Sequence, residues 1–205
     1  LQRALAIKRY ETSWSILQKL RAAMVNPDRS KLTGRVEVDE SYIGGPEKGK
    51  RGRGAEGKNL VVGAVEVREW KHPKTGNVST YAGRVRFRHI DNAIQPVLVD
   101  FALATVEGGS TVVTDGFEAY PILTQFGYSH EVESTARGME QNNVLKHYRI
   151  AVSNLKTLLK GTHHGAVKGK HLQGYLDEYA FRHNRRLNLF AAFQTMLGIA
   201  GKVTA

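Results

Sequence analysis

Two aspartates at the ends of predicted strands are the residues of this chain best suited to chemistry. Asp39 lies within GRVEVDESYI (34–43), and Asp115 directly follows the short apolar run TVVT (111–114). Carboxylates that are brought together offer the hard oxygen ligands that Mg²⁺ and Mn²⁺ prefer. A single aspartate is more often a turn or capping residue, so the chemical interpretation depends on the two side chains meeting.

A site of this kind is suited to phosphoryl transfer. Two divalent cations held about 3.5–4 Å apart can activate a water or a 3′-hydroxyl and stabilise the leaving oxygen. Two glutamates flank the first aspartate. We expect Glu37 to support Asp39 from the same strand face and Glu40 to be solvent-facing or structural.

The elements that must position these residues follow a definite order. Apolar periodicity and turn residues predict strands at 34–43, 60–69 and 81–89, a helix at 94–106, a strand at 111–114, a helix at 117–125, a strand at 128–133 and mostly helix over 141–204. This order predicts an α/β fold whose mixed sheet has three antiparallel strands, then parallel strands, with flanking helices. It is the order of the ribonuclease H-like fold, in which the first and fourth strands are neighbours.

Residues 1–33 are expected to form a helical segment and a linker ahead of a catalytic domain over 34–205. Apolar residues recur near the helical period over 1–26, and Thr12 and Ser13 are placed to cap a second helix. Basic side chains along the segment fit either the end of a helix-turn-helix DNA-binding region or an amphipathic packing helix. Because the sequence begins with Leu rather than Met, we expect it to start within a longer protein.

Charge points to a polyanionic partner. The chain has 30 Lys and Arg against 19 Asp and Glu, a formal net charge of +11, which favours DNA. The Gly-rich loop 44–58, which includes Lys48, Arg51 and Arg53, fits either a phosphate contact or a solvated hairpin tip. Cysteine is absent, which excludes disulfides, Cys-ligated zinc and thiol catalysis in this sequence. No apolar run reaches the roughly 20 residues of a spanning helix, so we expect no membrane association.

Four long blocks resemble bacterial insertion-sequence transposases of the ISXO-like branch of the DDE superfamily. They are RYETSWSILQKLRAAM (9–24), GRVEVDESYIGG (34–45), VVTDGFEAYPIL (112–123), and SNLKTLLKGTHHG (153–165) followed by KHLQGYLDEYAFRHNRR (170–186). The resemblance implies a metal-dependent enzyme that nicks the ends of an insertion sequence and joins them to target DNA. It further implies Mg²⁺ or Mn²⁺ as cofactor, a homo-oligomer on DNA, and action at the nucleoid in the bacterial cytoplasm. The Cys-rich zinc ribbon that begins similar chains is absent from this sequence.

The resemblance also assigns residues. Asp39 and Asp115 match the first two acids, and Asn154 in SNLK matches a third position that carries Asn in some members, with Lys156 nearby. The implied metal ligands are therefore Asp39, Asp115 and Asn154, since an amide oxygen also binds such cations. Lys156 is expected to hold a phosphate near the scissile bond.

Helix geometry leaves the third position open. Asn154 and Lys156 are two residues apart and do not share a helix face, whereas Arg149 and Lys156 are seven apart and do. Glu140 is a further candidate if the helix begins earlier. An arginine at the third position favours the alternative function, a catalytically inactive DNA-binding remnant of a transposase.

A histidine cluster near the C-terminus has two interpretations. Its members are His163, His164, His171 and His183. They resemble transition-metal ligands, but no carboxylate or cysteine lies at a firm ligand spacing. In the alternative interpretation, His163 and His164 contact phosphate beside the active-site helix.

Overall fold

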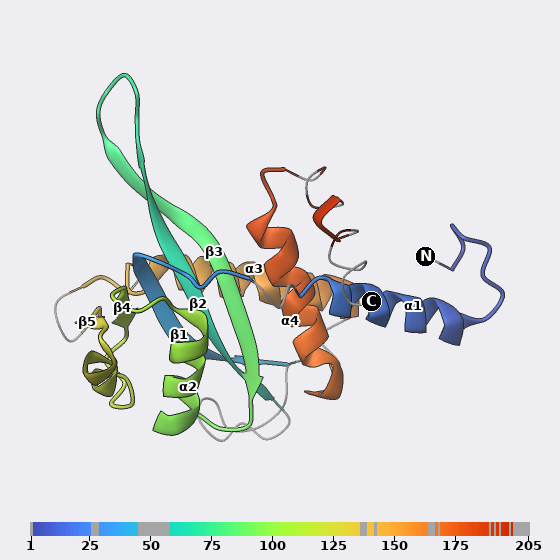
Figure 1. The fold of residues 1–205 in the computed structure, drawn as a ribbon, viewed down its shortest axis with the longest axis horizontal. Helices are drawn as coiled ribbons and strands as arrows, with labels where there is room; N and C mark the ends of the chain where they lie inside the picture. Colours follow the sequence, from blue (N-terminus) through green and yellow to red (C-terminus); the bar gives the residue numbers. More distant parts are fainter. Residues whose placement is uncertain are drawn as a thin grey trace.

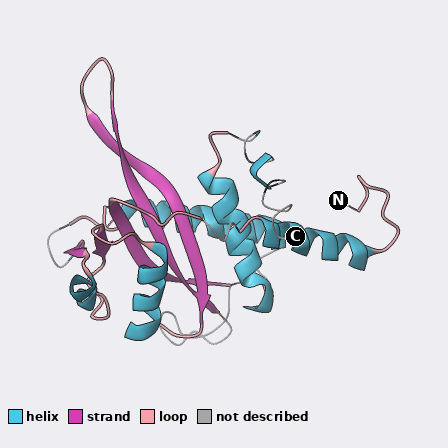
Figure 2. Ribbon diagram, in the orientation of Figure 1, coloured by secondary structure: helices cyan, strands magenta, loops and turns pink. Residues whose placement is uncertain are grey.

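A mixed five-stranded sheet, in the order β3-β2-β1-β4-β5, forms the centre of the computed structural model (Figures 1 and 2). The structure describes residues 2–25, 29–44, 58–135, 139–141, 143–163, 167 and 169–188, with a few more between 190 and 198. In chain order the elements are α1 (Tyr10–Ala23), β1 (Arg35–Ile43), β2 (Asn59–Lys71), β3 (Val78–Ile90), α2 (Gln95–Thr105), β4 (Thr111–Thr114), the 3₁₀ helix η1 (Pro121–Phe126), β5 (Ser129–Val132), α3 (Lys146–His163) and α4 (Gly169–Asn184).

The pairing of the strands is the predicted one. β1, β2 and β3 form an antiparallel meander, and β4 and β5 then add in parallel beside β1. The first connection within the described part of this meander is the turn HPKTGN (72–77), where Gly76 takes the left-handed φ of 72° that a side chain would disfavour. The sheet has the ribonuclease H-like arrangement, and its first and fourth strands are neighbours.

Helices cover both faces of the sheet because its central strands carry apolar side chains on both faces. On one face, Val61 and Val65 of β2 pack against Tyr148 and Leu155 of α3, and α4 completes this cluster. On the other face, the strands pack against α2 and the 3₁₀ helix. Figure 1 shows α2 and α3 on opposite sides of the strands.

The outer edge of β3 is closed by side chains of α4. Asn184 accepts a hydrogen bond from the backbone N–H of Val85 at 2.7 Å and donates to its carbonyl at 3.1 Å. Further along β3, Gln173 accepts a hydrogen bond from the backbone N–H of His89 and donates one to the carbonyl of Phe87. An exposed edge would present unpaired backbone groups to other chains, so α4 satisfies groups that no strand pairs.

The N-terminal segment differs from its prediction. One helix begins at Tyr10, and Thr12 and Ser13 lie inside it instead of capping a second helix. The reason is tertiary: α1 packs on α4, where buried Arg21 pairs with Glu178 at 2.7 Å. Packing of this kind outweighs a weak local capping preference. The geometry favours the packing-helix interpretation of this segment.

Two further predicted segments are the helix at 117–125 and the Gly-rich loop at 44–58. The helix expected at 117–125 is a shorter 3₁₀ helix that begins at Pro121 and ends at Phe126, and Gly127, with a φ of 83°, terminates it. Most of the Gly-rich loop, residues 45–57, lies outside the described residues. None of the described helices is both long and apolar enough to cross a membrane.

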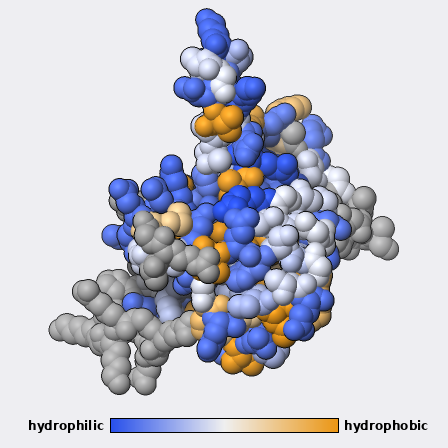
Figure 3. Space-filling view, turned by 90° about the vertical axis from the view of Figure 1, so that its left-hand side faces the viewer, coloured by the Kyte–Doolittle hydropathy of each residue, from blue (hydrophilic) through white to orange (hydrophobic). Residues whose placement is uncertain are grey.

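The far ends of β2 and β3 extend beyond the sheet as a two-stranded ribbon. Figure 3 shows this ribbon standing away from the body of the molecule. It exposes two large aromatic side chains, Trp70 and Tyr81, which are 49% and 45% accessible to solvent. They lie on one ribbon face, because their cross-strand partners are Ser79 and Arg68 respectively.

Candidate active site

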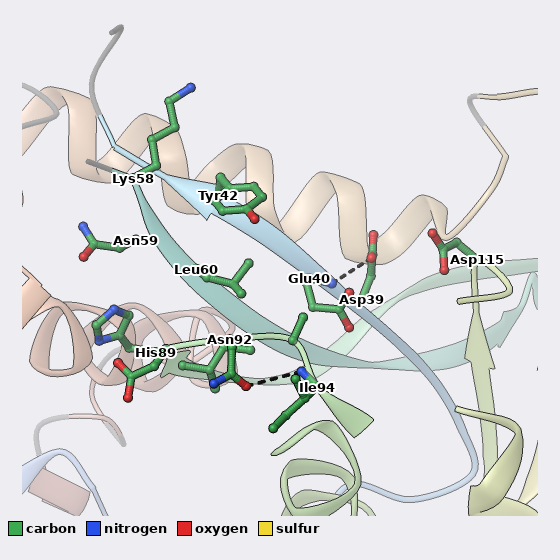
Figure 4. Close-up of a pocket in the computed structure, with 13 residues that line it drawn as sticks. Asp39, Glu40, Tyr42, Lys58, Asn59, Leu60, His89, Asn92, Ile94 and Asp115 are labelled. Atoms are coloured by element: carbon green, nitrogen blue, oxygen red, sulfur yellow. Dashed lines mark hydrogen bonds between the residues drawn. The ribbon is translucent and has the colours of Figure 1, made fainter. Parts of the chain in front are cut away.

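The pairing of β1 with β4 brings Asp39 and Asp115 to the same point of the sheet. Glu37 pairs with Val113 in the parallel ladder, so two residues further along each chain Asp39 stands level with Asp115. Matching positions on neighbouring strands place both side chains on one face. The two aspartates line one open cavity of about 820 Å³, and Figure 4 shows their carboxylates side by side.

Asp115 is positioned by a turn at the end of β4. Its carboxylate accepts the backbone N–H of Phe117 at 3.0 Å, which fixes the chain just after the strand. Between them, Gly116 has a φ of 99°, and a Cβ at this residue would lie 3.0 Å from the side chain of Val132. Both the backbone conformation and the close neighbour favour glycine here, and the Asp115 side chain beside it is exposed to solvent.

Asp39 lies in a half-buried position that disfavours its charge. Burial, and then the nearby charge of Asp115, raise the pKa of Asp39 to about 7. The backbone N–H of Glu40 offsets this in part by donating to the Asp39 carboxylate at 2.7 Å. A carboxylate pair held in this way gains from binding a cation, because the cation removes the repulsion between the two charges.

The two flanking glutamates have structural roles on opposite faces of β1. Glu37 is buried on the Asp39 face and accepts the backbone N–H of Tyr148 at 2.6 Å, as expected of a supporting residue. Glu40 points to the other face, where it accepts the hydroxyl hydrogen of Tyr120. The structural alternative therefore holds for Glu40. On the Asp39 face, the hydroxyl of Tyr148 also lies 3.2 Å from that of Ser41, so α3 is fixed against β1 on both sides of Asp39.

Helix α3 supplies positive charge to the site. A second cavity, of about 480 Å³, is lined by Asp39, Ser41, Tyr148, Arg149, Val152, Ser153, Lys156, Thr157 and Lys160. The basic members recur at the spacing of one helix face. The charge of Arg149 acts to lower the pKa of Asp39, and that of Asp39 acts to raise the pKa of Lys156. The net pKa of Lys156 is lowered, first by burial and then by the charge of Lys58.

The structure places Asn154, the residue that the resemblance assigns as the third metal ligand, outside both cavities. Asn154 is exposed on α3 and does not line either cavity, whereas Arg149 and Lys156 line the one beside Asp39. The reason is helical periodicity, since a residue two positions from Lys156 points about 200° away around the helix axis. Glu140 is exposed and precedes α3. Asp39 thus lines one cavity with Asp115 and a second with Arg149 and Lys156, whereas Asn154 lines neither.

Arg149 lies near the aspartates without pairing with them. Its guanidinium donates to the backbone carbonyl of Gln141, which ties it to the segment before α3. Within the part of the chain that the structure describes, no ion pair joins Arg149 to Asp39 or Asp115. The guanidinium of Arg149 therefore does not occupy the carboxylate oxygens of the two aspartates.

The described histidines do not assemble a metal site. The ring of His171 packs edge-on against Trp14 with centroids 5.4 Å apart, whereas His183 lies 3.2 Å from the carbonyl of Gly83. Burial lowers the pKa of His183 to about 4, so it is neutral inside the fold. His164 and the side chain of His163 lie outside the described residues. Over the described residues, no group of three or more His, Asp or Glu side chains is arranged to hold a metal ion.

Among the described residues, two carboxylates are therefore the groups that could hold a metal ion at this site. Asp39 and Asp115 offer paired oxygen atoms on one side of an open cavity, which suits a hard cation that keeps several water ligands.

Ser41, which lines the second cavity, is a site residue that the sequence analysis did not identify. It shares the polar face of β1 at two residues from Asp39. The alternation of the strand is the signal that could have found it.

Comparison with known proteins identifies the family of this chain. A family model described as the ISXO2-like transposase domain matches residues 31–184, a range that holds both aspartates, the whole sheet, α3 and α4. No curated protein matches the chain. The family match begins at the linker before β1 and ends with the last residue of α4. The chain belongs to the family of ISXO2-like transposase domains.

Proposed function

We propose that this domain cleaves DNA strands at the ends of an insertion sequence and joins them to target DNA, with Mg²⁺ or Mn²⁺ as cofactor. The observation that carries the proposal is the meeting of Asp39, in the middle of β1, with Asp115, directly after the parallel strand β4, while Lys156 lines a second cavity with Asp39. Asp39 and Asp115 would hold the cation, which when bound supplies activation of the attacking oxygen and charge stabilisation for the leaving oxygen.

The basic side chains around the aspartates have a separate task. Lys156 and Lys160 line the cavity that reaches Asp39, and Lys58 lines the neighbouring cavity that holds both aspartates. Their ammonium groups can bind the phosphates on either side of the scissile bond, and this holds the DNA strand in line with the carboxylates. Burial and the charge of Lys58 lower the pKa of Lys156, which means that they disfavour its positive charge. A bound phosphate would offset this effect by stabilising the ammonium group.

A second function, DNA binding without catalysis, is favoured by Arg149. This residue lines the cavity beside Asp39 on the helix face where a third acidic ligand would complete the site. A guanidinium at this position supplies no oxygen ligand, and its positive charge beside Asp39 disfavours a bound cation. In this alternative the fold and its basic surface are kept while strand cleavage is lost.

A cleavage assay separates the two functions. The substrate is a labelled duplex from the DNA that flanks the gene, with Mg²⁺ or Mn²⁺ added or chelated. The first function predicts metal-dependent nicking that Asp39→Asn and Asp115→Asn each abolish. Asp100→Asn is the matched control, because Asp100 is exposed and pairs with Arg88 away from the site. Tight DNA binding without nicking under either metal supports the second function.

We further propose that the active form is an assembly of several copies on DNA at the bacterial nucleoid. Joining two element ends to one target requires more than one active site, and the copies need a common DNA scaffold. Light scattering of the protein with and without an end duplex tests this. A complex that contains one protein copy per duplex at every ratio contradicts it.

A further inference from the structure

A row of arginines follows the edge strand β3. Arg84, Arg86 and Arg88 alternate with Val85 and Phe87, which point into the core beneath α3 and α4. The period of a strand therefore places all three guanidinium groups on the opposite face of the sheet. This is the face that α2 covers over the central strands.

The two outer arginines of the row are neutralised, and the middle one is not. Arg84 pairs with the buried carboxylate of Glu66 at 2.5 Å, and Arg88 pairs with Asp100 at 2.6 Å. Arg86 donates one hydrogen bond, to the backbone carbonyl of Ser30 at 3.3 Å. Among the described residues, no carboxylate lies within ion-pair distance of Arg86.

Further arginines converge on the same place. A cavity of about 470 Å³, which we call the arginine pocket, is lined by Met24, Arg29, Ser30, Arg84, Arg86, Asp177, Ala180, Phe181, Asn184 and Arg185. Arg185 is held there because its guanidinium lies 4.1 Å from the centre of the Phe181 ring. Asp177 is the acidic residue of the lining, and its carboxylate accepts the amide of Gln173 at 3.2 Å. The pocket thus holds more positive than negative charge.

The physical consequence is repulsion that an anion would relieve. Burial, followed by the charges of Arg29 and Arg84, lowers the pKa of Arg86 to about 10. Guanidinium groups present planar forks of N–H donors that match phosphate oxygens. The arginine pocket shares no lining residue with either cavity beside Asp39, so it is a separate site.

We propose that the arginine pocket binds a phosphate of the DNA backbone, with Arg86 as its central ligand, and this rests on the DNA substrate of the proposed function. The pocket lies at the edge of the sheet, between β3, α4 and the segment before β1. A phosphate bound there would hold a part of the DNA that lies apart from the DNA strand that reaches Asp39. Contacts of this kind position a duplex and read no sequence.

The test measures DNA binding in EDTA, without metal, so that it does not depend on catalysis. Fluorescence anisotropy of a labelled duplex is recorded across a salt series for the parent, Arg86→Gln and Arg88→Gln. Loss of one phosphate contact predicts affinity that is about fivefold weaker for Arg86→Gln on any sequence, with a log–log salt slope lower by about one. Arg88→Gln removes the same charge from the same strand but from a paired residue, so it should bind like the parent.

Two further measurements keep the outcome decisive. Arg86→Lys keeps the charge and should recover part of the affinity, which separates a phosphate contact from a folding defect. Equal effects of Arg86→Gln and Arg88→Gln overturn the proposal, as does an Arg86-dependent affinity for inorganic phosphate without one for DNA. If Arg86 governs DNA binding while the parent never cleaves DNA, the pocket stands and the proposed catalytic function fails.

Discussion

The carboxylate of Glu37 in β1 accepts the backbone N–H of Tyr148 in α3 at 2.6 Å, two residues before Asp39 along the strand. Glu37 is buried, so this hydrogen bond forms where water cannot replace it. It joins the strand that carries the first aspartate to the helix that carries Arg149 and Lys156. The relative position of carboxylates and basic residues therefore depends on Glu37.

Replacing Glu37 should destabilise the fold and misplace α3. Glu37→Ala leaves the N–H of Tyr148 buried without an acceptor, which costs about 1–3 kcal/mol in the free energy of unfolding. Urea unfolding measures this cost. Glu131→Ala is the control, because Glu131 pairs with Arg35 at the surface and should change stability by less than about 1 kcal/mol. Equal costs for both variants contradict the role given to Glu37.

The basic face of α3 predicts a difference between two neighbouring residues. Lys156→Ala should lower the rate of metal-dependent strand cleavage by at least about tenfold, because the ammonium group no longer holds a phosphate beside Asp39. Asn154→Ala changes the same helix but not the cavity, and should leave the rate unchanged. The resemblance alone predicts the opposite for Asn154. A loss of cleavage in Asn154→Ala that matches the loss in Lys156→Ala restores Asn154 as a ligand.

Arg149 predicts a gain of metal binding on substitution. Arg149→Glu places a third carboxylate on the α3 face that lines the cavity with Asp39, and it removes a positive charge that acts on Asp39. We expect about tenfold tighter Mn²⁺ binding, because affinity for hard cations rises with the number of charged oxygen ligands. Isothermal titration calorimetry measures this, with Asn154→Glu as a matched carboxylate on the wrong face. Equal Mn²⁺ affinity in the two variants is the contrary result.

Glu66 predicts how stability depends on pH. Burial acts to raise its pKa, but the hydrogen bonds from Arg84 and from the backbone of Thr33 outweigh it and lower the pKa to about 2. A folded-state pKa below the ordinary value of 4.5 means that the charged form stabilises the fold above pH 4.5. This contribution, about 3 kcal/mol, is lost as the pH falls from about 4.5 to about 2.

The measurement for Glu66 is urea unfolding of the parent and of Glu66→Gln between pH 7 and pH 3. Glu66→Gln should be less stable at pH 7 because it leaves Arg84 without its buried partner. The difference between the two proteins should narrow as the pH falls below 4.5, since protonation removes the same charge from the parent. A difference that stays constant down to pH 3 contradicts the ion-pair origin of the effect.

The order of the helices and strands could be predicted from the sequence, because hydrophobic periodicity and turn residues are local patterns. Alternation in 34–43 placed Asp39 on a polar strand face, and the pairs of β-rich runs predicted the meander that the structure contains. The parallel addition of β4 beside β1, which brings Asp115 level with Asp39, also followed from the order of strands and helices. Long blocks of family resemblance strengthened these same assignments.

Which side chains of α3 line the cavity with Asp39 depends on how the helix packs on the sheet, and the sequence does not show this. The match of SNLK put Asn154 forward, but the rotation of α3 about its axis is set by contacts far away in sequence, among them the one between Tyr148 and Glu37. Those contacts turn Arg149 and Lys156 toward the cavity that Asp39 lines and leave Asn154 outside it. In the same way, the packing of α1 on α4 depends on the pair of Arg21 with Glu178, and the charge balance around Arg86 depends on the partners of Arg84 and Arg88, which are Glu66 and Asp100. Partners that lie far apart in the chain meet only when the sheet and its helices have packed, and no local pattern records which of them will do so.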